Sequence, residues 1–148
     1  MELKQKVFAY ITCGQRLLVL NMVDYPHVGT QVPAGTRPVE EPADLAVMRE
    51  AVEETGLENL SLLGFLGELD FKVPDRDEVH RRRFYHLHCP GSPEARWRHY
   101  EMHPSEGDVD RVLFELFWVD FPEGVPELAL GHDAMLAELR RRLDNHPE

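Results

Sequence analysis

Residues 35–57 read GTRPVEEPADLAVMREAVEETGL, and this stretch decides the fold. Pro42 suits the first turn of a helix, because its missing N–H is not needed there and its fixed φ is helical. Gly56 suits the residue just past a helix end, where a left-handed backbone is common. Between them, Leu45, Met48 and Val52 recur at helical spacing, which predicts an apolar stripe along one side of the helix.

Three glutamates of the same helix, Glu50, Glu53 and Glu54, fall within an arc of about 100° on the side opposite this stripe. Because they lie three and four residues apart, their carboxylates can share an ion. A solvated helix face is the alternative interpretation of such a group. Oxygen ligands without Cys or His favour a hard cation, Mg²⁺ or Mn²⁺, over zinc.

Gly35, Glu41 and the run from Arg49 to Leu57 together resemble the signature box of the Nudix hydrolases, GX5EX7REUXEEXGU. These enzymes cleave a diphosphate linked to another group. The resemblance implies an α/β/α sandwich, with a mixed β-sheet between helices and the box as a catalytic loop-helix-loop. Ala51 stands where a bulkier aliphatic residue is usual, and Glu40 where many members have glycine, but neither departure removes a ligand.

The resemblance also implies a role for each charged box residue. Glu50 is expected to bind the metal and to help deprotonate a water, with Glu53 and Glu54 as companion ligands. Glu41, near the helix start, is expected to reach the metal shell or a coordinated water. Arg49 is expected to support the site and orient a catalytic glutamate, and it can also pair with Glu53 four residues later.

Two further metal ligands are implied outside the helix. The backbone carbonyl of Ala34 often completes the metal shell in this family; an ordinary tight turn at that position is the alternative. Members frequently recruit one more glutamate from outside the box, and Glu101, Glu106 and Glu115 are the candidates here. We rank Glu101 and Glu106 above Glu115, because residues at a loop edge can close over a substrate.

Substrate-binding residues are expected outside the box, with Arg83 and Trp97 as candidates. Arginine offers a fork of donors to phosphate, and Trp97 lies next to a polar loop, where it can stack on a base. For the run Arg81–Arg83 we favour a charged edge that protects a strand from mispairing. His86 and His88 would share one strand face and are expected to be hydrogen-bonded or solvent-facing. Pro74, 17 residues past the box, gives weak support for ADP-ribose as substrate.

The composition predicts a single domain over residues 1–148, with 43% hydrophobic residues to fill one core. A net charge of −11 argues against binding nucleic-acid duplexes, which needs a basic face. No segment approaches the roughly 20 apolar residues of a membrane span, and the first ten residues lack the apolar run of a secretory signal. Cys13 and Cys89 are too few and too scattered for a disulfide framework, so a reducing cytoplasmic location is expected.

The layout along the chain agrees with this sandwich. We expect a hairpin of two strands, Val7–Thr12 and Leu17–Asn21, and a second helix near the C-terminus with helical spacing and a basic end. A strand interrupted by two glycines predicts a bend or bulge. The other expected elements are a short strand and loop at His27–Pro33, strands at Leu60–Phe71, Arg83–His88, Trp97–Met102 and Val112–Val119, and the helix at Leu128–Leu143.

Two functions remain open from the sequence. The first is a hydrolase that uses Mg²⁺, or Mn²⁺ as a substitute, to cleave the diphosphate of a nucleotide or nucleotide-sugar type substrate by water attack at phosphorus. The second is a nucleotide-sensing module with the same fold and no turnover. All four box glutamates are present, which favours the enzyme. The expected partner is a small diphosphate molecule, and the chain is expected to be a monomer or homodimer.

Overall fold

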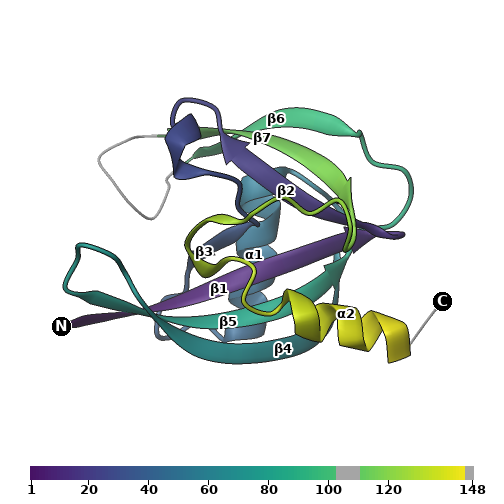
Figure 1. Ribbon diagram of the computed structural model, residues 1–148. Helices are drawn as coiled ribbons and strands as arrows, with labels where there is room; N and C mark the ends of the chain where they lie inside the picture. The colour runs from purple at the N-terminus through teal and green to yellow at the C-terminus, as the bar shows by residue number, and fades with distance from the viewer. Residues whose placement is uncertain (103–110, 146–148) are drawn as a thin grey trace.

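A seven-stranded mixed sheet forms the centre of the molecule in the computed structural model, which describes residues 1–102 and 111–145 (Figure 1). The strand order is β4-β5-β1-β2-β7-β6, and β3 pairs separately with β1. Strands β1 and β5 run parallel, and the other pairs are antiparallel. The strands are β1 (Glu2–Cys13), β2 (Arg16–Met22), β3 (Ala34–Thr36), β4 (Ser61–Lys72), β5 (Glu78–His88), β6 (Arg96–Met102) and β7 (Arg111–Asp120).

Helices cover both faces of this sheet, as Figure 1 shows: α1 (Ala43–Thr55) on one face and α2 (Leu136–Asn145) on the other. The side chains of β1 alternate between the faces. Val7, Ala9 and Ile11 pack in one cluster with the buried residues of α1, while Phe8 and Tyr10 pack in a second cluster with Leu139 of α2. The predicted sandwich is therefore confirmed. No helix within the described ranges is long and apolar enough to cross a membrane.

Several predicted elements are confirmed in detail. The first hairpin pairs Thr12 with Leu17 and Cys13 with Arg16. In β4 the register shifts at Gly64 and again at Gly67, as the two glycines predicted. The candidate strand Trp97–Met102 corresponds to β6.

Two predicted elements are wrong. The segment His27–Pro33 forms a 3-10 turn, η1 (Pro26–Val28), and two isolated bridges, and the strand begins only at Ala34. The C-terminal helix begins at Leu136 and not at Leu128. A second 3-10 turn, η2 (Ala129–Gly131), has left-handed φ values at its last two residues, and the backbone there is held by the Tyr10 hydroxyl, which donates to the carbonyl of His132 at 2.6 Å.

Helix α1 buries a different face from the one its large apolar residues predict. Leu45 and Val52 are 59% and 46% exposed, and only Met48 packs partly buried against the core, so the expected stripe is wrong at two of its three residues. The buried face instead carries Ala46, Val47, Glu50, Ala51, Glu54 and Thr55, which recur every three to four residues. The helix thus turns its small residues and two of its carboxylates toward the sheet. It ends as predicted, with Gly56 in the left-handed conformation at φ 73° and ψ 3°.

The arginine run at 81–83 lies inside the sheet. Strand β5 is flanked by β4 and β1, so the predicted charged edge is wrong. Arg81 binds Asp70 and Arg83 binds Glu68, each across to β4. The intervening Arg82 points to the other face, where it is buried against the rings of two phenylalanines, Phe8 and Phe71. The charges pair across strands because opposite neighbours in antiparallel strands face each other.

Candidate active site

Strand β3 brings the start of the box against helix α1. A Cβ atom added to Gly35 would lie 2.1 Å from both Cδ and Oε2 of Glu50, so only glycine allows this carboxyl group to approach the strand. The neighbouring backbone N–H of Ala34 donates to Oε1 of Glu54 at 3.1 Å. In a strand, the N–H and C=O of one residue point to the same side. The carbonyl of Pro33, one residue earlier, accepts a hydrogen bond from the N–H of Ala9 in β1 at 2.9 Å. The Ala34 carbonyl therefore points away from β1, toward α1.

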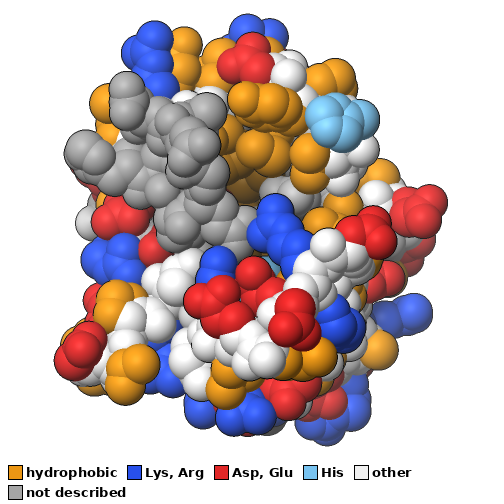
Figure 2. All heavy atoms as spheres, turned by 90° about the vertical axis from the view of Figure 1, so that its left-hand side faces the viewer, with side chains coloured by type: hydrophobic (Ala, Val, Ile, Leu, Met, Phe, Trp, Pro, Cys, Tyr) orange, Lys and Arg blue, Asp and Glu red, His pale blue; other side chains and the backbone are white. Residues whose placement is uncertain are grey.

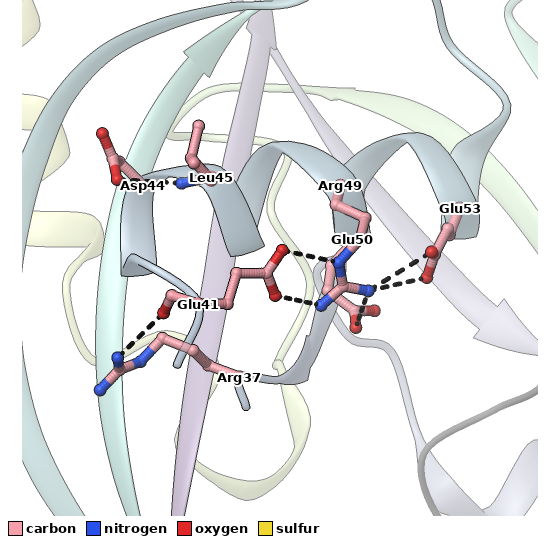
Figure 3. Close-up of polar contacts among 7 residues, drawn as sticks. All are labelled: Arg37, Glu41, Asp44, Leu45, Arg49, Glu50 and Glu53. Atoms are coloured by element: carbon pink, nitrogen blue, oxygen red, sulfur yellow. Dashed lines mark hydrogen bonds and ion pairs between the residues drawn. The ribbon is translucent and has the colours of Figure 1, made fainter. Parts of the chain in front are cut away.

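Arg49 connects three carboxylates of the box (Figure 3). Its Nε and Nη2 donate to the two oxygens of Glu41 at 3.0 and 2.8 Å. Its Nη1 donates to Oε1 of Glu50 at 3.0 Å and to both oxygens of Glu53 at 3.2 and 3.3 Å. The predicted pair with Glu53 is thus one contact of several. A guanidinium held at both ends fixes the orientation of each carboxylate that it binds.

A glutamate from β6 completes the acidic group. Single carboxylate oxygens of Glu50, Glu53 and Glu101 all lie within 4.8 Å of one another. Glu54 hydrogen-bonds to Glu101 beside them. Three of the four side chains are buried, and Glu53 is exposed. The structure therefore brings together residues that are about fifty positions apart in sequence, from one helix and the strand beside it.

The carboxylates of this group repel one another, and three of them are buried away from solvent. Burial raises the pKa of Glu50, which Arg49 partly opposes. Burial and the charge of Glu101 raise the pKa of Glu54 well above its usual value, and burial with the charges of Glu50 and Glu53 raises that of Glu101. The hydrogen bond from Arg49 lowers the pKa of Glu41. A cation among these groups would relieve both the burial cost and the repulsion.

The residues present fit a hard divalent cation. Oε2 of Glu50 is buried and has no hydrogen-bond partner in the part of the chain that the structure describes. An unpartnered buried carboxylate oxygen is costly unless something binds it. The available donors are all oxygens, which suits Mg²⁺ or Mn²⁺. On the face seen in Figure 2, acidic side chains gather beside Lys and Arg side chains.

The structure places the other predicted site residues differently. Glu106 lies outside the described residues. Glu115, on β7, binds Arg96 and Arg98. Trp97 packs partly buried against the core cluster and donates its indole N–H to the carbonyl of Thr55 at 2.9 Å. The remaining candidate, the Arg83 side chain, binds Glu68 and covers the ring of Phe65.

Two basic residues of the site were missed in the sequence. Lys6, on β1, is buried and donates to the Thr36 hydroxyl at 2.7 Å, and its charge lowers the pKa of Glu50. Arg37 donates to the carbonyl of Glu41 at 3.1 Å and to the side chain of Gln5. No local pattern distinguishes Lys6 from Lys4, because only the pairing of β3 with β1 brings it beneath the box.

A hollow of about 960 Å³ in the described part of the chain lies elsewhere. It is lined by residues of the first hairpin, β4, β5 and α2, including His86 and His88, which share a strand face as predicted. His86 is bonded to the Thr12 hydroxyl at 2.7 Å. None of the box carboxylates lines this hollow. We assign the site from the carboxylates and not from cavity size, because charge convergence and not volume is what the chemistry of phosphate requires.

Comparison with known proteins agrees with the geometry. The NUDIX domain family matches residues 3–139. No curated protein sequence matches the chain. A MutT NUDIX hydrolase from Burkholderia pseudomallei superposes with a TM-score of 0.67, at 23% identity, covering 94% of this chain and 99% of that one. A MutT protein from Methanosarcina mazei Go1 gives 0.65 at 15%, covering 95% and 96%.

A third similar structure contains a metal ion. It is a bifunctional NMN adenylyltransferase/ADP ribose pyrophosphatase from Francisella tularensis, complexed with AMP and a Mn ion, with a TM-score of 0.54 at 16% identity. It covers 96% of this chain and 41% of that one. Together with the family match, which spans nearly the whole described sheet and all of α1, these similarities support a Nudix pyrophosphohydrolase. The chain belongs to the Nudix family.

Proposed function

We propose that this chain is a divalent-metal-dependent hydrolase that cleaves the diphosphate of a nucleoside diphosphate linked to another moiety. The observation that carries the proposal is the convergence of Glu50, Glu53 and Glu101, together with the unpartnered buried Oε2 of Glu50. A site built only for solubility would leave its acids exposed. Here Glu50, Glu54 and Glu101 are buried side by side, which is unfavourable unless a cation binds.

The residues that would hold the ion are Glu50, Glu53 and Glu101, with Glu54 as a fourth carboxylate and the Ala34 carbonyl as a backbone ligand. Glu54 has one oxygen engaged by the Ala34 N–H, and a cation between Glu54 and Glu101 would replace the hydrogen bond that joins these two carboxyl groups. Mg²⁺ is the expected ion, with Mn²⁺ as a substitute. When bound, such an ion neutralises phosphate charge and lowers the pKa of a water.

The protein's own groups then orient and deprotonate the attacking water. Arg49 holds Oε1 of Glu50, so Oε2 is the oxygen that would face the ion and its water. Glu41 binds Arg49 with both oxygens and thereby fixes the guanidinium. Glu41 thus acts on the site through Arg49. The water attacks phosphorus, and the bond to the bridging oxygen breaks.

The substrate class we propose is a nucleotide or a nucleotide-sugar type diphosphate. The Francisella tularensis relative is described as an ADP ribose pyrophosphatase, and ADP-ribose therefore belongs in the first panel. Arg83 and Trp97 stay as predicted substrate contacts. Trp97→Phe keeps the ring and removes the N–H bonded to Thr55; a raised KM would support substrate contact, and a loss of stability alone would assign Trp97 to packing.

The test is a phosphate-release screen of purified protein against nucleoside di- and triphosphates, ADP-ribose, sugar nucleotides and dinucleoside polyphosphates. Each substrate is tried with Mg²⁺, with Mn²⁺ and with EDTA. Glu50→Gln and Glu101→Gln should lower turnover by at least roughly 10²-fold, since each removes a group acting on the transition state. Glu115→Gln is the matched control, because it removes a strand glutamate that faces Arg96 and Arg98 instead.

A nucleotide-sensing module with the same fold is the alternative. It predicts nucleotide binding without turnover of any panel member in a folded, metal-loaded protein. Unchanged turnover in both Glu50→Gln and Glu101→Gln would refute the site assignment while leaving the enzyme in place. If Glu106→Gln abolished turnover and Glu101→Gln did not, the glutamate outside the box would be Glu106.

A further inference from the structure

The two cysteines of the chain meet in the fold, although 75 residues separate them in sequence. Cys13 is the last residue of β1, and Cys89 directly follows β5. These strands run parallel in a register that pairs Thr12 with His88, so Cys13 and Cys89 are the next pair. The backbone N–H of Cys89 donates to the carbonyl of Thr12 at 2.8 Å. This bond holds the ends of β1 and β5 together next to the two cysteines.

The thiols point to the same side of the sheet. Cys89 is buried in the cluster beneath α1, and Cys13 packs against the same cluster. Both thiols are free, and Cys13 is close enough to raise the pKa of Cys89. The Cys13 thiol donates to the carbonyl of Gly91 at 3.4 Å, and the Cys89 thiol donates to that of Pro90 at 3.7 Å. Neighbouring strands lie about 4.8 Å apart, which falls inside the roughly 4.4–6.8 Å range of Cα separations found in disulfides. The two cysteines, far apart in sequence, are therefore neighbours in the fold.

An oxidant can reach one thiol and not the other. Cys13 is partly exposed and lines a hollow of about 640 Å³ together with Gly91, Trp118 and neighbouring residues. Cys89 is 3% exposed, and burial raises the pKa of its thiol. This asymmetry separates an attacking thiol from a resolving one, which is the arrangement that favours a disulfide over further oxidation of a single sulfur.

We propose that Cys13 and Cys89 form a reversible intramolecular disulfide when the protein meets hydrogen peroxide. The Cys13 sulfur attacks the peroxide oxygen and becomes a sulfenic acid, and the first water leaves. The Cys89 sulfur then attacks the Cys13 sulfur; the S–S bond forms and the hydroxyl leaves as a second water. Two thiols are oxidised by two electrons and one peroxide is reduced to two waters. A dithiol reductant reverses the step by exchange.

The disulfide would act on stability and not on turnover. Along β1, Cys13 lies six residues from Val7, which pairs with Gly35 of the box, a separation of roughly 20 Å. A bond between residues 13 and 89 closes a loop over half of the chain, so it constrains the unfolded state strongly. The thermal midpoint of the oxidised protein should rise by roughly 5–10 °C.

The experiment treats reduced, folded protein with hydrogen peroxide and follows intact mass and non-reducing peptide maps. The expected product is a monomer lighter by two hydrogens, with peptides containing Cys13 and Cys89 linked and released again by dithiothreitol. Cys89→Ala should stop at a sulfenic acid on Cys13 that dimedone traps. Cys13→Ala should resist oxidation, because its remaining thiol is buried. Alanine is chosen because a buried cysteine packs as a small apolar residue.

Circular dichroism and the thermal midpoint of each reduced variant show whether it folds. A disulfide that forms only after unfolding in urea would overturn the proposal. So would disulfide-linked dimers as the main product, or equal oxidation of Cys13→Ala and parent. Because no readout requires turnover, failure here leaves the proposed hydrolase untouched, and failure of the hydrolase leaves this proposal untouched.

Discussion

Replacing Gly35 with alanine tests the active-site geometry most directly. The new Cβ would lie 2.1 Å from Cδ and Oε2 of Glu50 and 2.6 Å from its Cγ, where ordinary contact begins at 3.4 Å. The Glu50 carboxyl group must therefore move by about 1.3 Å, the difference between 3.4 and 2.1 Å. The backbone of Gly35 is not left-handed, so the substitution adds a local clash without backbone strain.

The expected loss follows from that displacement. A misplacement of about 1 Å at a reacting group can reduce kcat/KM by about 10²-fold, which corresponds to about 2.7 kcal/mol of transition-state stabilisation. The free energy of unfolding should fall by only about 1–2 kcal/mol, because Glu50 loses its contact with Arg49 but regains water. Apparent Mn²⁺ affinity should fall with kcat/KM, since the same oxygen is displaced.

Gly64→Ala is the matched control. Gly64 is also a strand glycine without left-handed φ, but its added Cβ would meet only the flexible end of Arg142, at 3.3 Å. We expect this variant to keep kcat/KM and Mn²⁺ affinity within about threefold of the parent. The assay combines steady-state hydrolysis, a metal-binding isotherm and urea unfolding for all three proteins. If Gly35→Ala matched the parent in both kcat/KM and Mn²⁺ affinity, the reasoning from this contact would be refuted.

Three further predictions follow from other contacts. Arg49→Lys keeps the charge but loses the fork that binds Glu41, so kcat/KM should fall about 10–100-fold. The control is Arg141→Lys, which loses a comparable fork on the exposed surface of α2 and should match the parent in the same kinetic assay. Burial and neighbouring acids raise the pKa of Glu101, so an incoming ion must displace a proton. Calorimetric titrations should therefore show apparent Mn²⁺ affinity falling by up to about tenfold per pH unit below neutrality, and less steeply in Glu101→Gln. Burial lowers the pKa of His132 to about 3. Below the unfolded-state pKa of 6.5, only the unfolded state takes up a proton at this residue. Between pH 7.5 and pH 5, the parent should therefore lose about 2 kcal/mol more free energy of unfolding than His132→Gln, measured by urea unfolding.

The box could be found from the sequence because its chemistry is local. Gly35, Glu41 and the helix from Arg49 onward lie within 23 residues, so their spacing can be recognised directly in the sequence. The same holds for the hairpin and for the bulges of β4, where glycine positions mark the irregularities. What such a pattern cannot give is which distant residue faces the helix. Glu101 and Glu115 both lie in strands, and only the pairing of β6 with β7 shows which of them faces the helix.

Glu101 and Glu115 differ by which face of the sheet they occupy. In β6, Trp97, His99 and Glu101 alternate toward α1, and His99 binds the carbonyl of Glu53. Glu115 pairs with Arg98, a residue on the opposite face of β6. A shift of one residue in strand register would exchange these faces. Ranking the candidate glutamates by how close they lie to a loop could therefore include Glu101. It could not exclude Glu106 or Glu115.

The wrongly predicted face of α1 has a physical cause that also indicates function. Hydrophobic periodicity predicts which side of a helix is buried only if burial of apolar surface sets its orientation. In α1 the inward side carries Glu50 and Glu54, while Leu45 and Val52 face outward. Burying two acids and exposing two large apolar residues opposes stability on both counts. Such a conflict between local pattern and fold is expected where a site and not the core sets the orientation. The exposed leucine and valine therefore support the same proposal as the buried carboxylates, that this helix is oriented to present oxygens to a cation.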